Sequence, residues 1–347
     1  LGRALARKGH EVMIYKGIDP SEKEEKVQVE KNLTIWYLPM KHLGAHGFMD
    51  CKNLDPQLKA LFCFGDQQIF LPHVYRWCRR RRIPFVAYVG TAHSLDSNFK
   101  SKVMNALFAA GTLRIYKKNP VLAKTSAAKE ELRQLGVPHA VIAPVGLDTA
   151  VLKKNIPADE KMRLRKEHGF EADDVILCNV SRLSWEKRPL ELIDLFLQVK
   201  GKKKFKLIIV GNGPLEEELN EKIRKNGLEK EVKIYPNVPY EKMWEIYEMS
   251  DHYLNMNKGE IFGMAIMEAV YYKTSVAAIR ALGPSVTLKD MKGHKLCEND
   301  DEMAEWITGP YPSEKDLQES SEKMAATFTW DRCADAFLQA SSEKSSR

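Results

Sequence analysis

The feature that most constrains the fold of this chain is a series of short apolar runs separated by longer stretches with helical periodicity. Strands that alternate with helices favour parallel sheets. Many of these runs are apolar on both faces, as a sheet covered on both sides requires. We therefore predict a doubly wound α/β protein. The runs are LTIWYLP (33–39), PFVAYVG (84–90), HAVIAPVG (139–146), VILCNVS (175–181), KLIIVG (206–211), VKIYPNV (232–238), DHYLNM (251–256) and TSVAAI (274–279).

The domain organisation follows from the polar stretch at about 145–172, after which a fresh strand begins. This predicts one Rossmann-like half at 1–150, a second at 151–325, and a terminal helix at 326–347. The chain opens with LGRALARKGHEVMIY, which indicates the end of a helix followed by a strand. A strand and a glycine-rich turn normally precede such a helix, so we expect that the first βα unit is missing.

Charge is distributed unevenly along the chain. Residues 1–145 hold 23 Lys and Arg against 12 Asp and Glu, whereas the whole chain has a net charge of +7. A basic half suggests an anionic partner, and a solvated surface is the alternative. The run Arg79 to Arg82 is interpreted either as a patch that faces an anionic membrane or as a solvated helix end.

Two cations follow a strand in VSRLSWEKRP (180–189). Arg182 comes directly after the strand and Lys187 five residues later. Open α/β sheets bind ligands at this edge, and the two cations could neutralise a pyrophosphate. The alternative is that both are solvated loop residues that pair with Glu186 or Glu191.

A glycine turn follows the next strand, in LIIVGNGPLEEEL (207–219). Gly211 and Gly213 would let the backbone turn sharply and approach a ligand closely. The glutamates that follow also suit a helix N-terminus without any ligand, so this signal is weak alone.

The segment GEIFGMAIMEA (259–269) places Glu260 and Glu268 eight residues apart in an apolar stretch. A helix that begins near Phe262 or Gly263 would offer free N–H groups to an anion and would carry both carboxylates on one face. Such a pair fits the two hydroxyl-bearing ends of a nucleotide sugar. An amphipathic core helix with Glu268 on its rim is the alternative.

In this order and spacing, these three segments resemble the C-terminal domain of the retaining glycosyltransferases of family 4, with their E-x7-E motif and GT-B fold. APVGLDTAVL (143–152), ALGPSV (281–286) and TFTWDRCADAF (327–337) resemble smaller signatures of that family. The resemblance implies two Rossmann-like domains that face each other across a cleft. Residues 1–150 would bind the acceptor, 151–325 the nucleotide sugar, and 326–347 would cross back to the first domain.

The resemblance also implies roles for individual residues. Arg182 and Lys187 would hold the donor diphosphate, Glu260 would lie near the donor sugar, and Glu268 would bind the ribose. His93 would lie beside the anomeric carbon, or would be a structural histidine. Further donor contacts would come from Phe262, Gly263, Met264, Gly211, Gly213 and Val238.

The expected function is transfer of a hexose from a UDP- or GDP-sugar to an acceptor hydroxyl with retention, in cell-surface polysaccharide or glycolipid synthesis. The alternatives are another GT-B enzyme, such as a nucleotide-sugar 2-epimerase, and a non-catalytic nucleotide-sugar-binding protein. The expected partners are the nucleotide sugar, a carbohydrate or lipid-linked acceptor and an anionic membrane surface, with no nucleic acid. We expect no cofactor and no metal ion, and a cytoplasmic enzyme that can lie at the inner membrane face.

Overall fold

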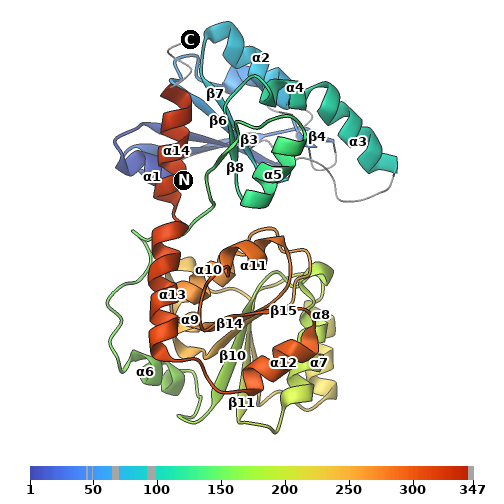
Figure 1. Ribbon diagram of the computed structural model, residues 1–347, viewed down its shortest axis with the longest axis vertical. Helices are drawn as coiled ribbons and strands as arrows, with labels where there is room; N and C mark the ends of the chain where they lie inside the picture. The colour runs from blue at the N-terminus through green and yellow to red at the C-terminus, as the bar shows by residue number, and fades with distance from the viewer. Residues whose placement is uncertain (44–45, 49, 65–69, 92–98, 343–347) are drawn as a thin grey trace. The chain divides into compact units, whose positions relative to one another are not determined.

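The computed structural model describes residues 1–43, 46–48, 50–64, 70–91 and 99–342. The chain divides into two compact units (Figure 1). Unit 1 comprises Leu1–Val145 together with Thr329–Arg347, and unit 2 comprises Gly146–Phe328. Over the described residues, no helix combines the length and the apolar character that crossing a membrane requires.

Unit 2 is built on a six-stranded sheet in which every pair of neighbouring strands is parallel. The order is β12-β11-β10-β13-β14-β15. The central strands are apolar on both faces, as the sequence predicts for a covered sheet. The strands are β10 Val175–Val180, β11 Phe205–Val210, β12 Val232–Tyr235, β13 His252–Asn255, β14 Ser275–Ile279 and β15 Lys295–Cys297.

Helices cover both faces of this sheet (Figure 1). Helices α7, α8 and α12 bury their apolar stripes against one face in a single core cluster. Helices α9 and α10 contact strands on the other face, and α13 packs on α10. The helices of unit 2 are α6 Glu160–Glu167, α7 Pro189–Val199, α8 Glu216–Lys225, α9 Met243–Met249, α10 Met264–Tyr271, α11 Leu282–Thr287, α12 Asp300–Thr308 and α13 Glu314–Thr327, with short 3-10 turns η2 Trp185–Lys187 and η3 Tyr240–Lys242.

Unit 1 contains a parallel sheet of order β6-β7-β8-β9 and a smaller sheet of order β1-β3-β2. Strand β7 is buried along its whole length, with α2, α4 and α5 in the core on one face and α1 and α14 in the core on the other. Helix α14, the last of the chain, thus packs within unit 1. The strands are β1 Val12–Ile18, β2 Glu25–Glu30, β3 Leu33–Pro39, β4 His42–Leu43, β5 His46–Gly47, β6 Leu61–Phe64, β7 Phe85–Val89, β8 Val121–Ala123 and β9 Val141–Ile142. The helices are α1 Gly2–Arg7, η1 Cys51–Asn53, α2 Leu71–Arg81, α3 Phe99–Ala110, α4 Thr112–Tyr116, α5 Ser126–Gln134 and α14 Trp330–Ser342.

Each apolar run of the sequence contains a strand, but the prediction differs from the structure in two respects. The run 139–146 forms only the two-residue strand β9. Strands β2, β4, β5, β6, β8 and β15 were not predicted. Strand β2 is charged and pairs antiparallel with β3, whereas β8 and β15 have three residues each, too few to show a period.

Two glycines allow the loops that follow β10 and β11 to pack closely against each other. A Cβ atom on Gly211 would lie 1.9 Å from the carbonyl oxygen of Ser181, and one on Gly213 would lie 2.4 Å from that of Leu183. The Leu183 N–H donates to the Asn212 carbonyl oxygen at 2.8 Å. The close backbone approach that these glycines allow is therefore between two loops of the protein itself.

We expect Gly211→Ala to lower the free energy of unfolding by more than about 2 kcal/mol, because backbone atoms cannot move aside and because φ is 141° there. Gly227→Ala is the matched control. Its φ is also positive, at 62°, but nothing lies within 4 Å of the added Cβ. It should cost only about 1 kcal/mol. Urea denaturation of both variants measures the difference, and equal losses would contradict the steric explanation.

His252 in β13 is 2% exposed. Burial lowers the pKa of its imidazole from 6.5 to about 4. The unfolded chain therefore takes up a proton near pH 6.5 and the folded protein only near pH 4. The stability that depends on neutral His252 is complete above pH 6.5 and is lost as the pH falls toward 4.

We therefore expect the melting temperature to fall between pH 6.5 and pH 4, and His252→Phe to flatten this dependence. Phe keeps a ring against Tyr311, whose ring centroid lies 5.3 Å from that of His252, but it does not titrate. Melting curves across this pH range test the prediction. If the variant and the wild type lost stability in parallel, His252 would not be the group responsible.

Candidate active site

The candidate site lies where the strand order of unit 2 reverses. The chain runs outward from β10 to β11 and β12, then returns to place β13 on the other side of β10. Because all six strands are parallel, the loops after β10 and β13 leave the same edge of the sheet. Open α/β sheets bind their ligands at such a reversal.

An ion pair joins these two loops. Lys187, in the turn η2 after β10, donates from Nζ to Oε2 of Glu260, in the loop after β13, at 2.8 Å. The two side chains are 24% and 15% exposed. The pair is therefore sheltered but open to solvent, and a ligand could reach both charges.

The carboxylate of Glu260 is held from several sides. Asn257 Nδ2 donates to the same Oε2 at 3.1 Å, and its Oδ1 accepts from the N–H of Gly259. Asn255 hydrogen-bonds to the carboxylate as well. Burial alone would raise the pKa of Glu260, but the hydrogen bonds from Lys187 and the two asparagines outweigh it, so the pKa is lowered. Glu260 is thus a fixed anion.

The backbone around Glu260 is fixed by the turn that opens α11. The N–H of Gly283 donates to the carbonyl oxygen of Glu260 at 2.8 Å. A Cβ on Gly283 would lie 2.6 Å from the nitrogen of Phe262, so only glycine allows this approach. The segment ALGPSV (281–286), which contains Gly283, therefore supports the loop that carries Glu260.

The helix after Glu260 starts at Met264, with Gly263 as its N-cap in the left-handed conformation at φ 83° and no side-chain cap. The first N–H groups of such a helix have no partner within the helix. Phe262 is buried and its ring packs edge-on against Phe328. Met264 is half-buried.

The prediction that Glu260 and Glu268 share one helix face is wrong. Glu260 precedes the helix and belongs to the loop, because the chain turns through the left-handed Gly263 before α10 begins. Glu268 lies inside α10 and is buried, so it does not lie on an exposed rim either. Both carboxylates nevertheless lie near the buried Tyr253, whose pKa is raised first by burial and then by charges that include both glutamates.

Glu268 lines a small cavity of about 20 Å³. Tyr247 donates from its hydroxyl to Oε2 of Glu268 at 2.8 Å, and Tyr240 forms a second hydrogen bond with the carboxylate. Burial raises the pKa of Glu268 despite these bonds. The aromatic and apolar side chains around the cavity are Val151, Leu152, Met243, Trp244 and Tyr272, with Lys153 and Glu241.

The remaining predicted residues lie as follows. Arg182 is exposed and its side chain forms no hydrogen bond or ion pair within the described ranges, although its carbonyl oxygen accepts from the N–H of Ser184. Val238 is half-buried in the loop after β12, which Asn212 joins by donating from Nδ2 to the carbonyl oxygen of Pro236. Gly211 and Gly213 join loops at the same sheet edge. His93 lies outside the described residues.

The sequence analysis missed the residues that hold the carboxylates, namely Asn255, Asn257, Tyr247 and Tyr240. The two asparagines stand two residues apart where β13 ends, and polar residues at that position are a usable signal for a ligand site. Tyr247 gave none, since an aromatic residue on an apolar helix face is usually core. Tyr240 lies in the polar turn η3 and gave no signal either. Among the described residues, no group of three His, Cys, Asp or Glu side chains is placed to hold a metal ion.

Comparisons with known proteins concern the family and the fold of this chain. The family described as glycosyl transferases group 1 matches residues 160–323. The D-inositol 3-phosphate glycosyltransferase of Xylanimonas cellulosilytica is 23% identical over 100% of this chain and 90% of its own length. The alpha-monoglucosyldiacylglycerol synthase of Acholeplasma laidlawii is 21% identical over 78% of this chain and 72% of its own.

Two solved structures share the fold. Sucrose-phosphate synthase from Thermosynechococcus elongatus matches with a TM-score of 0.74 at 15% identity, over 99% of this chain and 92% of its own. The Anabaena protein HepE, in complex with UDP and glucose, matches with a TM-score of 0.68 at 18% identity, over 91% of this chain and 87% of its own. The chain thus has the GT-B fold, and its residues 160–323 match the group 1 glycosyl transferases.

Proposed function

We propose that this protein transfers a hexose from a nucleoside diphosphate sugar to an acceptor hydroxyl and retains the anomeric configuration. The observation that carries the proposal is the Lys187–Glu260 ion pair at the strand-order reversal between β10 and β13. A donor of this kind carries one group that can replace Glu260 as the partner of Lys187 and another that can replace Lys187 as the partner of Glu260. Its diphosphate is an anion for Lys187, and its sugar hydroxyls are donors for Glu260.

A UDP- or GDP-sugar is the proposed donor. HepE was solved with UDP and glucose, which supports a uridine nucleotide among proteins of this fold. In our proposal Arg182 and Lys187 bind the diphosphate, with the free N–H groups at the start of α10. Glu260 accepts from sugar hydroxyls and Glu268 from the ribose, while Val238 lies near the base.

In the proposed reaction, the acceptor oxygen forms a bond to the anomeric carbon as the bond from that carbon to the diphosphate oxygen breaks. The acceptor proton passes to the leaving diphosphate, so no separate protein base is required. Negative charge grows on the leaving group, and Lys187 and Arg182 stabilise it. His93, on unit 1, is proposed beside the anomeric carbon.

The acceptor is proposed to be a carbohydrate or a lipid-linked glycan in polysaccharide or glycolipid synthesis. One of the relatives is named a glucosyldiacylglycerol synthase. Helix α3 supports contact with a lipid surface, because Val103, Ala106, Leu107 and Ala110 are exposed and fall on one helical stripe. The enzyme would then be cytoplasmic and bind the inner face of the membrane peripherally.

Exposed basic side chains lie on α3 and on the neighbouring helices of unit 1. Helix α3 contacts α4, and α4 contacts α2. Exposed cations occupy these elements and the residues next to them, namely Arg79, Arg80, Arg81, Arg82, Lys102, Arg114, Lys117 and Lys118. An apolar stripe among cations fits an anionic bilayer, at roughly 1 kcal/mol per basic residue near the surface.

Removing either charge of the ion pair should stop transfer. We expect Lys187→Ala and Glu260→Gln each to lower kcat by about 100-fold or more with the cognate UDP- or GDP-sugar, since each loses electrostatic stabilisation and leaves the other group unpaired. Release of nucleoside diphosphate, measured across a panel of donors and acceptors, is the readout. Near-wild-type rates in both variants would dismiss the assignment.

Matched controls are Lys225→Ala and Glu229→Gln, which make the same changes on the exposed surface of unit 2 and should keep wild-type rates. The wild type separates the alternatives. A nucleotide sugar that is interconverted without any acceptor would indicate an epimerase. A donor that raises the melting temperature but is neither transferred nor interconverted would indicate a binding protein.

The membrane contact is tested by sedimentation with phosphatidylcholine vesicles that contain or lack phosphatidylglycerol. We expect binding to the anionic vesicles alone, and its loss in the double variant Val103→Glu/Leu107→Glu. The control Val141→Glu/Ile142→Glu changes two exposed apolar residues of β9 in the same unit and should bind normally. Equal partitioning of all proteins would remove the membrane from the proposal.

A further inference from the structure

Arg188, next to Lys187, adopts a backbone conformation that arginine rarely takes. It lies between η2 and α7, with φ 55° and ψ 49°, the left-handed region. This conformation costs about 1 kcal/mol or more for a residue with a Cβ, and glycine would adopt it freely. The turn that presents Lys187 therefore depends on contacts that hold Arg188 in place.

The side chain of Arg188 supplies those contacts. Its NH1 and NH2 groups donate to Oδ1 and Oδ2 of Asp300 at 3.0 and 2.7 Å, a two-point pair that only a guanidinium can form. NH1 also donates to the Met256 carbonyl oxygen at 3.3 Å, and Nε to Glu191 at 3.3 Å. The Arg188 side chain is 15% exposed, whereas Asp300 and Glu191 are 35% and 45% exposed, so the guanidinium is sheltered from water and its carboxylate partners are in contact with it.

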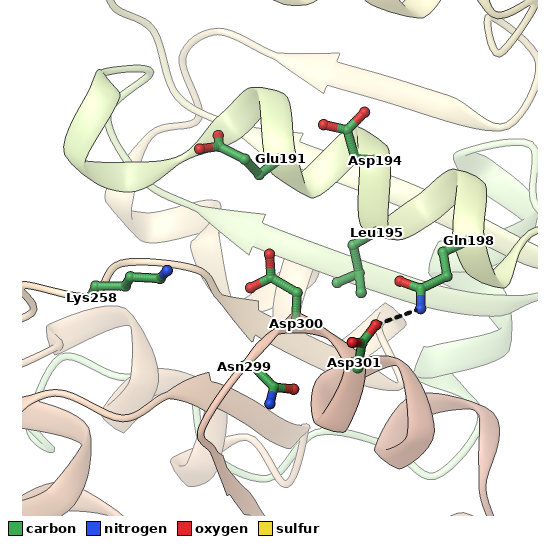
Figure 2. Close-up of a pocket in the computed structure, with 8 residues that line it drawn as sticks. All are labelled: Glu191, Asp194, Leu195, Gln198, Lys258, Asn299, Asp300 and Asp301. Carbon is green, nitrogen blue, oxygen red and sulfur yellow. Dashed lines mark hydrogen bonds between the residues drawn. The ribbon is translucent and has the colours of Figure 1, made fainter.

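These contacts join three segments at the candidate site. Asp300 is the first residue of α12, and Met256 directly precedes Asn257 in the loop that carries Glu260. Arg188 thus connects the Lys187 turn to the loop of its ion-pair partner, with α12 as the common support. Figure 2 shows Asp300 and Glu191 on the wall of an open hollow between α7 and the start of α12.

The hollow itself, about 400 Å³ in volume, carries no site. It is lined largely by acidic side chains with Lys258 at one end, and Asp301 is hydrogen-bonded to Gln198 (Figure 2). Asp300 and Asp301 are adjacent in the first turn of α12, yet of the two it is Asp300 that accepts the two hydrogen bonds from Arg188. Neutralising Asp300 removes the partner of Arg188, whereas neutralising Asp301 removes the same negative charge from the adjacent position without touching that pair. A comparison of the two therefore distinguishes loss of the Arg188 contact from loss of acidic charge.

We propose that Arg188 is a positioning residue, and that its two-point pair with Asp300 sets the geometry of the Lys187–Glu260 pair that receives the donor. The expected effect on transfer rests on the proposed function. The expected effect of Arg188 on the geometry of the Lys187–Glu260 pair does not. If this Arg188–Asp300 pair, the clamp, is broken, Lys187 should lose its fixed contact with Glu260. The charged groups and amides around that carboxylate are Lys187, Asn257 and Asn255, and of these only Lys187 would be released directly.

The test compares Asp300→Asn with Asp301→Asn. We expect Asp300→Asn to lower kcat/KM for the nucleotide sugar by about tenfold or more, a loss of about 1.4 kcal/mol of transition-state stabilisation, and Asp301→Asn to leave it unchanged. Arg188→Gly should show the same loss as Asp300→Asn. Because glycine removes the backbone strain as well as the clamp, this variant also guards against a simple failure of Asp300→Asn to fold.

A second measurement does not depend on activity. The pKa of the Glu260 carboxyl, followed by NMR with ¹³C-labelled glutamate and assigned by its loss in Glu260→Gln, should rise in Asp300→Asn and Arg188→Gly. It should keep its wild-type value in Asp301→Asn. A merely structural clamp would change the melting temperature without moving this titration.

The inference is overturned if the Glu260 titration is the same in all four proteins, or if Asp301→Asn shifts it as much as Asp300→Asn. A wild type that neither binds nor turns over nucleotide sugars would overturn the proposed function. Even then, the titration would still decide whether Arg188 positions the ion pair.

Discussion

A sheltered pair of opposite charges is the interaction on which the candidate site depends. A lysine and a glutamate that are both largely removed from water are stable only while each has a partner, since an unpaired buried charge is costly. Without a ligand, Lys187 and Glu260 satisfy each other. The donor that we propose, a nucleotide sugar, would offer an anion and several hydroxyl groups at once, and so would replace both partners in a single step. A ligand with only one of these groups would leave the other charge unpaired, and this favours the complete donor over its fragments.

The strand order of the sheet determines where this pair lies, and glycines allow the loops that carry it to pack closely. Loops leave neighbouring parallel strands about 5 Å apart, too close for side chains to separate their backbones. At Gly211, Gly213 and Gly283 the missing Cβ lets one loop lie directly on the next. The loop after β11 thus packs backbone against backbone on the loop after β10, and the loop after β14 packs in the same way on the loop after β13. A rigid edge of this kind holds Lys187 and Glu260 in place although both stand on loops.

The sequence was sufficient for the fold because strand and helix signals alternate along most of the chain, and the runs at 175–181 and 274–279 are apolar enough to require a covered parallel sheet. It was also sufficient to select Lys187 and Glu260 as candidates. It could not show that they bind each other, because 73 residues separate them and their contact depends on the strand order. The placement of both glutamates on one helix face failed for a local reason. The left-handed turn at Gly263 ends the loop before the helix begins, and no residue pattern distinguishes that turn from an earlier helix start.

Arg188 shows how a local conflict can indicate function. Local preference alone would place glycine at its left-handed backbone, as at Gly263 and Gly213 in the same region. Instead the chain has an arginine there and stabilises it with Asp300 and the Met256 carbonyl oxygen. Glycine would relieve the strain but would remove the bond from Arg188 to the Met256 carbonyl oxygen, so that the Lys187–Glu260 pair would lose this second link between its two loops. Strained backbone persists where the surrounding contacts over-determine it, and such positions concentrate at functional sites. The strain at Arg188 is therefore best understood as the cost of a rigid link between the two halves of one ion pair.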